Sequence, residues 1–135
     1  MDEGVIDQLF EAAAKVRAAA YAPYSQFRVG AAILCEDGRL FAGCNVENAA
    51  FPSGTCAEES AIAAMVSAGA RQISTLVVLG DAPTPVTPCG ACRQRIREFA
   101  HSTTRIIAGN VAGARLEFSM HELLPHSFSL RGDKI

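Results

Sequence analysis

TCAEESAI, at residues 55–62, and PCGACRQ, at residues 88–94, hold three of the five cysteines of this chain. Cys56 stands at the start of one predicted helix. Cys89 and Cys92 lie three residues apart at the start of another, so both face the same side. Three thiolates can bind a zinc ion and leave its fourth position open for water, which is typical of catalytic sites. The sequence therefore predicts a catalytic zinc site with Cys56, Cys89 and Cys92 as ligands.

Glu58 follows Cys56 by two residues and lies in the same first helical turn, turned away from the cysteine's own direction. A glutamate there can face the metal without binding it and can move the protons of a water molecule. The alternative is an acidic residue favoured at a helix start by the helix dipole, which suits the neighbouring Glu59 better. We therefore expect Glu58 to be the catalytic residue.

Two other interpretations of the cysteines remain. The C-x-x-C pair could be a redox dithiol, although such a pair needs neither Cys56 nor Glu58. A structural zinc site could be closed by a histidine as fourth ligand, but each histidine lies in a polar setting where a solvent-facing side chain is more common. These histidines are His101, His121 and His126.

Length and composition limit the function further. A chain of 135 residues predicts one domain, residues 1–135. No apolar run reaches the length of a membrane helix, and the first residues are acidic rather than basic, so we expect a cytoplasmic protein with reduced thiols and no membrane partner. The net charge is −2 and no basic face is apparent, which argues against nucleic acid as a partner and favours a small-molecule substrate.

Hydrophobic periodicity predicts alternating helices and strands. An amphipathic helix over residues 3–20 precedes a hairpin of two strands joined by Glu36-Asp37-Gly38. The unbroken apolar run in residues 73–80 predicts a central strand that is buried on both faces. The remaining predicted elements are strands 27–35, 39–46, 104–108 and 115–118, and helices from Thr55 or Cys56 to Ala68, 89–99 and 121–124. This order predicts an α/β fold with a mixed sheet between helical layers.

Five motifs occur in one order along nearly the whole chain: YAPYSQFRVGAA at 21–32, GCNVENAA at 43–50, TCAEESAI, PCGACRQ, and ELLPHSF at 122–128. On these motifs the chain resembles the small, homotetrameric cytidine deaminases. The resemblance implies a three-layer α-β-α fold with a mixed five-stranded sheet, Zn²⁺ on the three cysteines, and Glu58 as proton shuttle. It also implies hydrolytic deamination of cytidine and deoxycytidine to uridine and deoxyuridine plus ammonia, in pyrimidine salvage.

The resemblance further implies which residues contact the nucleoside: Phe27, Asn45, Glu47, Ala57 and Phe128. Asn45 and Glu47 would bind the ribose 3′-hydroxyl, and the two phenylalanines would pack on the ring, with Phe128 reaching in from a neighbouring subunit. Asn45 and Glu47 alternate on one strand face, although an exposed strand edge explains them as well. Phe128 stands alone in a polar tail, where an aromatic lid on a base explains it better than a core position.

Two positions depart from the pattern that the resemblance implies. Phe51 stands where many members carry tyrosine, and Glu59 stands where an arginine often bonds the thiolates. We expect Glu59 to turn toward solvent or an arginine. The helix N-termini, with Arg93 beside Cys92, are then expected to balance the thiolate charge.

Two rival functions stay open. One is deamination of another aminopyrimidine compound such as blasticidin S, which Asn45, Glu47 and Phe128 disfavour. The other is a non-catalytic, zinc-stabilised interaction domain, against which Glu58 argues, because a closed structural site has no use for a base.

Overall fold

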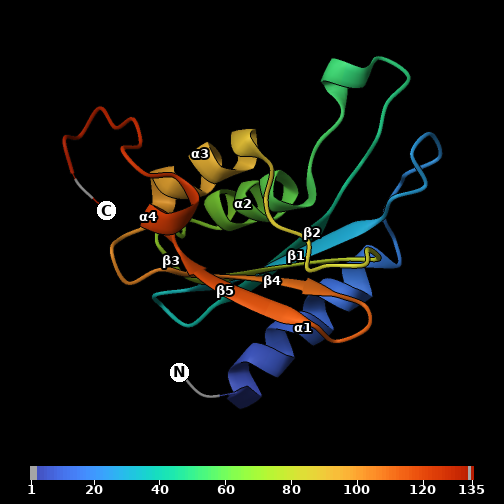
Figure 1. Ribbon diagram of the computed structural model, residues 1–135. Coiled ribbons are helices and arrows are strands. Elements are labelled where there is room, and N and C mark those ends of the chain that lie inside the picture. The colour runs from blue at the N-terminus through green and yellow to red at the C-terminus, as the bar shows by residue number, and fades with distance from the viewer. Residues whose placement is uncertain (1–2, 134) are drawn as a thin grey trace.

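A five-stranded sheet forms the centre of the computed structural model, which describes residues 3–133 and 135 (Figure 1). The strand order is β2-β1-β3-β4-β5; β3 and β4 are parallel and the other neighbours are antiparallel, so the sheet is mixed, as expected. In chain order the elements are α1 (Glu3–Arg17), β1 (Val29–Cys35), β2 (Leu40–Cys44), the 3₁₀ helix η1 (Phe51–Ser53), α2 (Ala57–Ser67), β3 (Ile73–Gly80), α3 (Gly90–Phe99), β4 (Arg105–Asn110), β5 (Arg115–Ser119) and α4 (Met120–Leu123).

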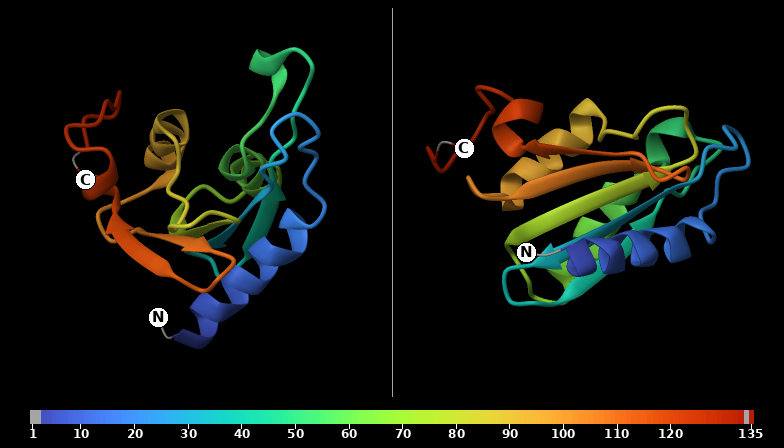
Figure 2. Two further views of the ribbon diagram at one scale, coloured as in Figure 1. Left: turned by 45° about the vertical axis from the view of Figure 1, so that its right-hand side comes forward. Right: turned by 60° about the horizontal axis from the view of Figure 1, so that its bottom comes forward.

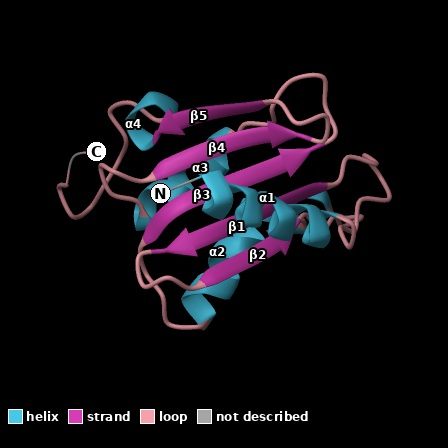
Figure 3. Ribbon diagram, turned by 90° about the horizontal axis from the view of Figure 1, so that it is seen from below, coloured by secondary structure: helices cyan, strands magenta, loops and turns pink. Residues whose placement is uncertain are grey.

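Helices cover both faces of the sheet. α1 lies across one face, and α2 and α3 lie on the other (Figures 1 and 3). Side chains of β3 alternate between the two layers: Leu76 and Val78 pack toward α2 and α3, while Val77 and Leu79 pack toward α1. A strand that is buried on both faces needs apolar residues at every position, which explains its unbroken apolar run. The predicted three-layer α-β-α fold is confirmed.

Several element boundaries differ from those expected. α1 ends at Arg17 instead of residue 20, and β1 begins at Val29 instead of residue 27. The cause at β1 is Asn45, whose side chain bonds the backbone of Phe27 and Val29, so a side chain takes the place of a strand partner there. β2 is correspondingly shorter than residues 39–46, and Val46 retains only isolated bridges to Tyr21 and Thr55.

Close backbone packing fixes α2 on the sheet. A Cβ atom added at Gly43 of β2 would overlap the backbone of Ser60 and Ala61 in α2, so only glycine permits this approach. This approach brings the first turn of α2 directly over the sheet and so sets where Cys56 lies.

Two segments extend beyond the layers on opposite sides of the molecule. Residues 45–56, which include η1, form an arm beside the loop of residues 21–28 (Figure 2), and the rings of Tyr24 and Phe51 meet with centroids 6.2 Å apart. The C-terminal tail lies on the other side, where the buried Arg97 of α3 donates to Ser127 Oγ and to the Asp133 carbonyl oxygen, both at 2.8 Å. Within the described residues, the helices include none long and apolar enough to cross a membrane.

Candidate active site

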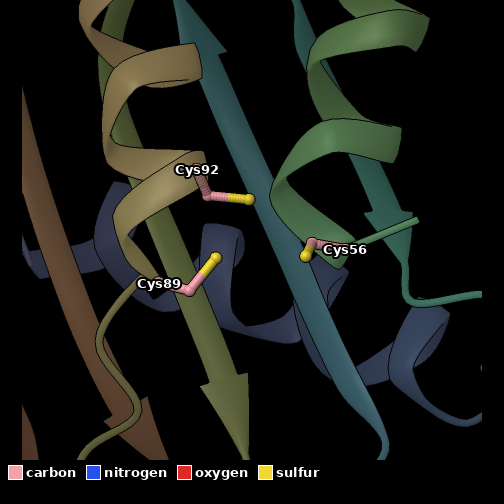
Figure 4. A group of neighbouring side chains, drawn as sticks. All are labelled: Cys56, Cys89 and Cys92. Atoms are coloured by element: carbon pink, nitrogen blue, oxygen red, sulfur yellow. The ribbon is translucent and has the colours of Figure 1, made fainter. Parts of the chain in front are cut away.

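Three cysteine sulfurs converge between the starts of α2 and α3 (Figure 4). Cys56 is the N-cap residue of α2, Cys89 is the N-cap residue of α3, and Cys92 lies in the first turn of α3. Their Sγ atoms all lie within 4.8 Å of one another, and across the described part of the chain no histidine or carboxylate joins this cluster. Thiolates about 2.3 Å from a tetrahedral zinc ion lie roughly 3.8 Å apart, so the three sulfurs fit one ion with an open fourth position.

The electrostatic setting also fits a metal. Burial raises the pKa of the Cys56 and Cys92 thiols. Burial acts in the same direction on Cys89, but hydrogen bonding by the Cys92 backbone and side chain brings the pKa of Cys89 below its usual range. Without a cation, the raised pKa values of Cys56 and Cys92 favour their neutral thiol forms. A zinc ion, which deprotonates its thiol ligands, supplies the charge that this donor set needs.

Glu58 lies in the wall of a cavity of about 630 Å³ beside the cysteines. Its side chain is nearly inaccessible, at 5% exposure, and burial raises the pKa of its carboxyl group. A raised pKa brings the charged and neutral forms of a carboxyl group closer in free energy near neutral pH. Such a group can take up and release protons more readily. The position of Glu58 agrees with the predicted catalytic role, which stays a prediction.

The cavity collects most of the other predicted site residues. Its wall comes from residues 24–29, from the arm with the start of α2, and from the loop that leads to α3. It includes the predicted residues Phe27, Asn45, Glu47, Cys56, Ala57, Glu58 and Cys89. Cys92 lies fully buried behind this wall, and Phe128 is not among the lining residues.

Asn45 and Glu47 hold the loop that forms the far wall. The Asn45 Oδ1 atom accepts the Val29 N–H at 2.9 Å, and Nδ2 donates to the Phe27 carbonyl oxygen at 2.8 Å. Glu47 Oε1 accepts the N–H groups of Tyr24 and Ser25 at 3.0 and 3.1 Å, and Oε2 accepts the Ser25 hydroxyl.

The Ser25 hydroxyl, followed by the backbone N–H groups, holds the pKa of Glu47 below its usual range. A carboxylate has about four lone-pair sites, so Glu47 keeps acceptor capacity toward the cavity. Sequence reasoning missed the loop partners Tyr24 and Ser25. Their one sequence signal is their place in the motif at residues 21–32.

The aromatic residues near the cavity are accessible to solvent. Phe27 lines the cavity and is 38% exposed, and Phe51 is 77% exposed. Phe128 is 67% exposed, and its carbonyl oxygen accepts Gln94 Nε2 of α3 at 3.2 Å. The structure therefore brings Phe27 to the cavity of its own chain and leaves Phe128 outside it.

Glu59 turns to an arginine, as expected. Its Oε1 atom accepts the Cys56 N–H at 3.3 Å, and its Oε2 atom lies 3.7 Å from Arg95 Nη2. The expectation that Arg93 stands against the thiolates was wrong, because Arg93 donates to the carbonyl oxygens of Pro88 and Leu123, at 2.8 and 3.0 Å. The arginine that contacts a ligand sulfur is Arg95, whose Nη1 atom lies 3.5 Å from Cys92 Sγ. The three-residue spacing from Cys92 is the sequence signal that identifies it.

Comparisons with known proteins agree with this geometry. The family described as "Cytidine and deoxycytidylate deaminase zinc-binding region" matches residues 5–109. A cytidine deaminase of Sporosarcina psychrophila is 44% identical over 124 residues, which cover 92% of this chain and 91% of the relative. One from Halalkalibacterium halodurans is 41% identical over 121 residues, covering 90% and 92% of the two chains.

A solved structure is similar to this chain in its fold as well as in its sequence. The 1.6 Å crystal structure of cytidine deaminase from Burkholderia pseudomallei superposes with a TM-score of 0.87 at 41% identity, covering 95% of this chain and 100% of that chain. The matched family region contains all three cysteines and Glu58. The chain therefore belongs to the cytidine and deoxycytidylate deaminase zinc-binding family.

Proposed function

We propose that the chain catalyses the zinc-dependent hydrolytic deamination of cytidine and deoxycytidine, which yields uridine or deoxyuridine and ammonia. The observation that carries this proposal is the convergence of three cysteine sulfurs within 4.8 Å beside a cavity whose wall also holds Glu58. The cavity, of about 630 Å³, lies in the range of small-molecule sites. The names of the two relatives and of the solved structure support the same activity.

Cys56, Cys89 and Cys92 would hold the zinc ion. When bound, zinc acts as a Lewis acid that lowers the pKa of a water molecule at the open position, toward about 7 in well-studied sites. Glu58 would take one proton from that water and deliver it to N3 of the base as the water oxygen bonds C4. It would then carry the remaining proton of that oxygen to the amino group, which leaves as ammonia when the C4–N bond breaks. The buried setting that raises the pKa of Glu58 favours this repeated exchange of protons.

Recognition of the nucleoside falls to the opposite wall of the cavity. Phe27 offers its ring to the pyrimidine, and Ala57 contributes a small surface next to the reacting carbon. Asn45 and Glu47 bind the 3′-hydroxyl with the hydrogen-bonding capacity that their loop contacts leave free. This assignment is supported by the position of all four residues in the cavity wall.

Phe128 covers the base from a neighbouring subunit of a homotetramer. Its exposure, and its absence from the cavity of its own chain, support a role toward another chain. Mixing Phe128→Ala subunits with Glu58→Gln subunits should restore part of the activity, because some sites then combine an intact base with an intact lid. A fully active monomer in sedimentation would contradict the tetramer.

The functional unit and its location stay predictions. We expect residues 1–135 to act as one domain in the cytoplasm, with a small nucleoside as partner and no nucleic acid or membrane partner. The net charge of −2 supports the exclusion of nucleic acid, which normally binds to clustered basic residues.

The direct test follows the loss of cytidine absorbance together with ammonia release and zinc content. The proposal expects turnover of cytidine and deoxycytidine at comparable kcat/KM, in proportion to bound zinc. Blasticidin S serves as the competing substrate. Turnover of blasticidin S alone would identify a different deaminase, and a zinc-loaded protein without turnover would identify a non-catalytic domain.

A further inference from the structure

Arg95 and Glu59 form an ion pair that joins α2 and α3 at the end where the zinc ligands lie. Arg95 Nη2 lies 3.7 Å from Glu59 Oε2, and Arg95 Nη1 lies 3.5 Å from Cys92 Sγ. Glu59 Oε1 accepts the Cys56 N–H at 3.3 Å. A polar chain therefore runs from the backbone of one ligand residue to the sulfur atom of another.

Both members stand at the same offset from a ligand. Glu59 follows Cys56 by three residues on α2, and Arg95 follows Cys92 by three residues on α3. Residues at this spacing lie on one face of a helix, so both side chains are directed to the metal end. The two side chains are 39% and 34% exposed, and an ordinary ion pair at that exposure contributes little to stability. The contact with the sulfur atom therefore distinguishes this pair from a surface salt bridge.

The metal site needs a cation nearby. Zinc with three thiolates carries a net negative charge, and Cys92 is fully buried. An opposite charge within about 4–6 Å stabilises a buried anion. Arg93 is closer in sequence, but its guanidinium donates to two backbone carbonyl oxygens instead. Among the described residues, Arg95 is the arginine for which a contact with a ligand sulfur is found.

We propose that Arg95 is the cation that balances the charge of the three-thiolate zinc site, and that Glu59 is a positioning residue that holds Arg95 against Cys92. The positive charge of Arg95 stabilises the net negative, zinc-loaded site, so the bound zinc leaves more slowly. The contact also draws electron density from the Cys92 sulfur, so the zinc remains more electrophilic. This inference rests on the zinc site of the proposed function but not on its substrate.

The first test measures the rate at which zinc passes from the loaded protein to a colorimetric chelator. Arg95→Gln should release zinc about 10-fold faster, because outer contacts of metal ligands typically contribute factors of about 10–100 to affinity. Arg95→Lys keeps the positive charge, so its zinc release rate should lie between those of the unaltered protein and Arg95→Gln. Arg105→Gln, which removes an ion pair with Glu117 on β5, is the matched control and should release zinc at the unchanged rate. An unchanged rate in Arg95→Gln overturns the proposal.

A second readout separates a charge effect from a general loosening of the fold. In the cobalt-substituted protein, loss of the guanidinium leaves the Cys92 sulfur richer in electrons, so the thiolate-to-cobalt charge-transfer band should move to lower energy in Arg95→Gln. Arg95→Lys should restore part of the shift. Faster zinc release with an unmoved band would show a role in packing alone and would overturn the charge-balancing role.

A double-mutant cycle tests Glu59. Glu59→Gln should shift both readouts in the same direction as Arg95→Gln but by less, and adding it to Arg95→Gln should cause no further change. Fully additive effects would overturn the positioning role. Neither readout requires turnover, so a negative result leaves the deaminase proposal untouched. Equally, an inactive protein with the expected zinc release would refute the deaminase proposal alone.

Discussion

The two walls of the cavity differ sharply in how they are built. On the metal side, Cys92 is inaccessible to solvent and Glu58 is 5% exposed, and both lie at helix starts that are packed on the sheet. On the nucleoside side, loop residues dominate, and Phe27 and Phe51 are 38% and 77% exposed. The three cysteines and Glu58 are thus assembled by packed elements of one chain, while the loop wall opposite them stays accessible to solvent.

The difference in construction follows from what each wall must do. The Lewis acid and base act through fixed geometry, and the close contact of Gly43 with α2 supplies a rigid support for Cys56. The nucleoside must enter and leave, so its wall is held by surface hydrogen bonds such as those from Tyr24 and Ser25 to Glu47. Substitutions on the metal side should therefore change chemistry, and those on the nucleoside side should change affinity.

The largest effect is expected from removal of a ligand. Cys92→Ala should lose zinc and essentially all turnover, because two thiolates do not complete the site. Cys44→Ala is the matched control, since Cys44 lies on β2 outside the cluster and should retain both. Zinc content and cytidine turnover, measured side by side, check the prediction. A zinc-loaded, active Cys92→Ala protein would contradict the assignment of zinc binding and chemistry to the metal side.

The nucleoside side should respond to the sugar and not to the metal. A 3′-deoxy analogue leaves the groups around Asn45 and Glu47 without their partner and should lower kcat/KM by roughly 5- to 150-fold. The 2′-deoxy substrate should react with kcat/KM of the same order as cytidine. Glu47→Gln should narrow the gap between cytidine and the analogue at unchanged zinc content. Equal turnover of the 3′-deoxy analogue by the unaltered protein would contradict the assignment.

The tail that carries Phe128 depends on Arg97, which is 2% exposed and bonds Ser127 and Asp133. Arg97→Gln should lower the free energy of unfolding by about 1–3 kcal/mol, because buried hydrogen bonds are lost. It should also raise KM a few-fold at unchanged zinc content. Arg131→Gln removes an exposed ion pair with the Glu98 carboxylate and an exposed hydrogen bond to the Glu98 carbonyl oxygen, and it should cost less than Arg97→Gln, about 0.5 kcal/mol. Urea unfolding of both variants measures these free energies. An equal loss of unfolding free energy in the two variants would contradict the role of Arg97 in holding the tail.

The smallest effect concerns pH. Hydrogen bonds from Ser25 and Tyr24 lower the pKa of Glu47, so its contribution to stability is fully present above the unfolded value of about 4.3 and is lost as the pH falls through the lower folded value. The amide resonances of Tyr24 and Ser25 should titrate in that acidic range. Glu47→Gln should abolish the titration. If the amide resonances titrate unchanged in Glu47→Gln, the titration belongs to another group and the prediction is wrong.

Periodicity and residue spacing predicted much of this molecule. The unbroken run in β3 indicated a strand covered on both faces, and the two cysteine motifs indicated the ligands, because both signals are local. Contacts between distant segments were harder. The hydrogen bonds between Asn45 and the backbone of Phe27 and Val29, which shorten β1, join residues 18 and 16 positions apart and have no local signature.

The error over Arg93 has a similar origin. Adjacency in sequence placed it beside Cys92, but successive residues on a helix point about 100° apart, so Arg95 at the three-residue spacing meets the sulfur instead. The carbonyl oxygens that Arg93 binds belong to Pro88 and to Leu123 on α4, and the second of these is visible only once the helices are packed. The exposure of Phe128 outside its own cavity likewise became evident only from the fold.

The division of labour between a metal side that performs the chemistry and a nucleoside side that performs recognition is tested most directly on Glu58→Gln. Zinc content and deoxycytidine binding, measured by calorimetry, should match the unaltered protein. Turnover should fall by several orders of magnitude, since general acid–base catalysis typically contributes about 10²–10⁴-fold and Glu58 acts in more than one proton transfer. Near-normal turnover by a zinc-loaded Glu58→Gln protein would contradict this division and remove Glu58 from the mechanism.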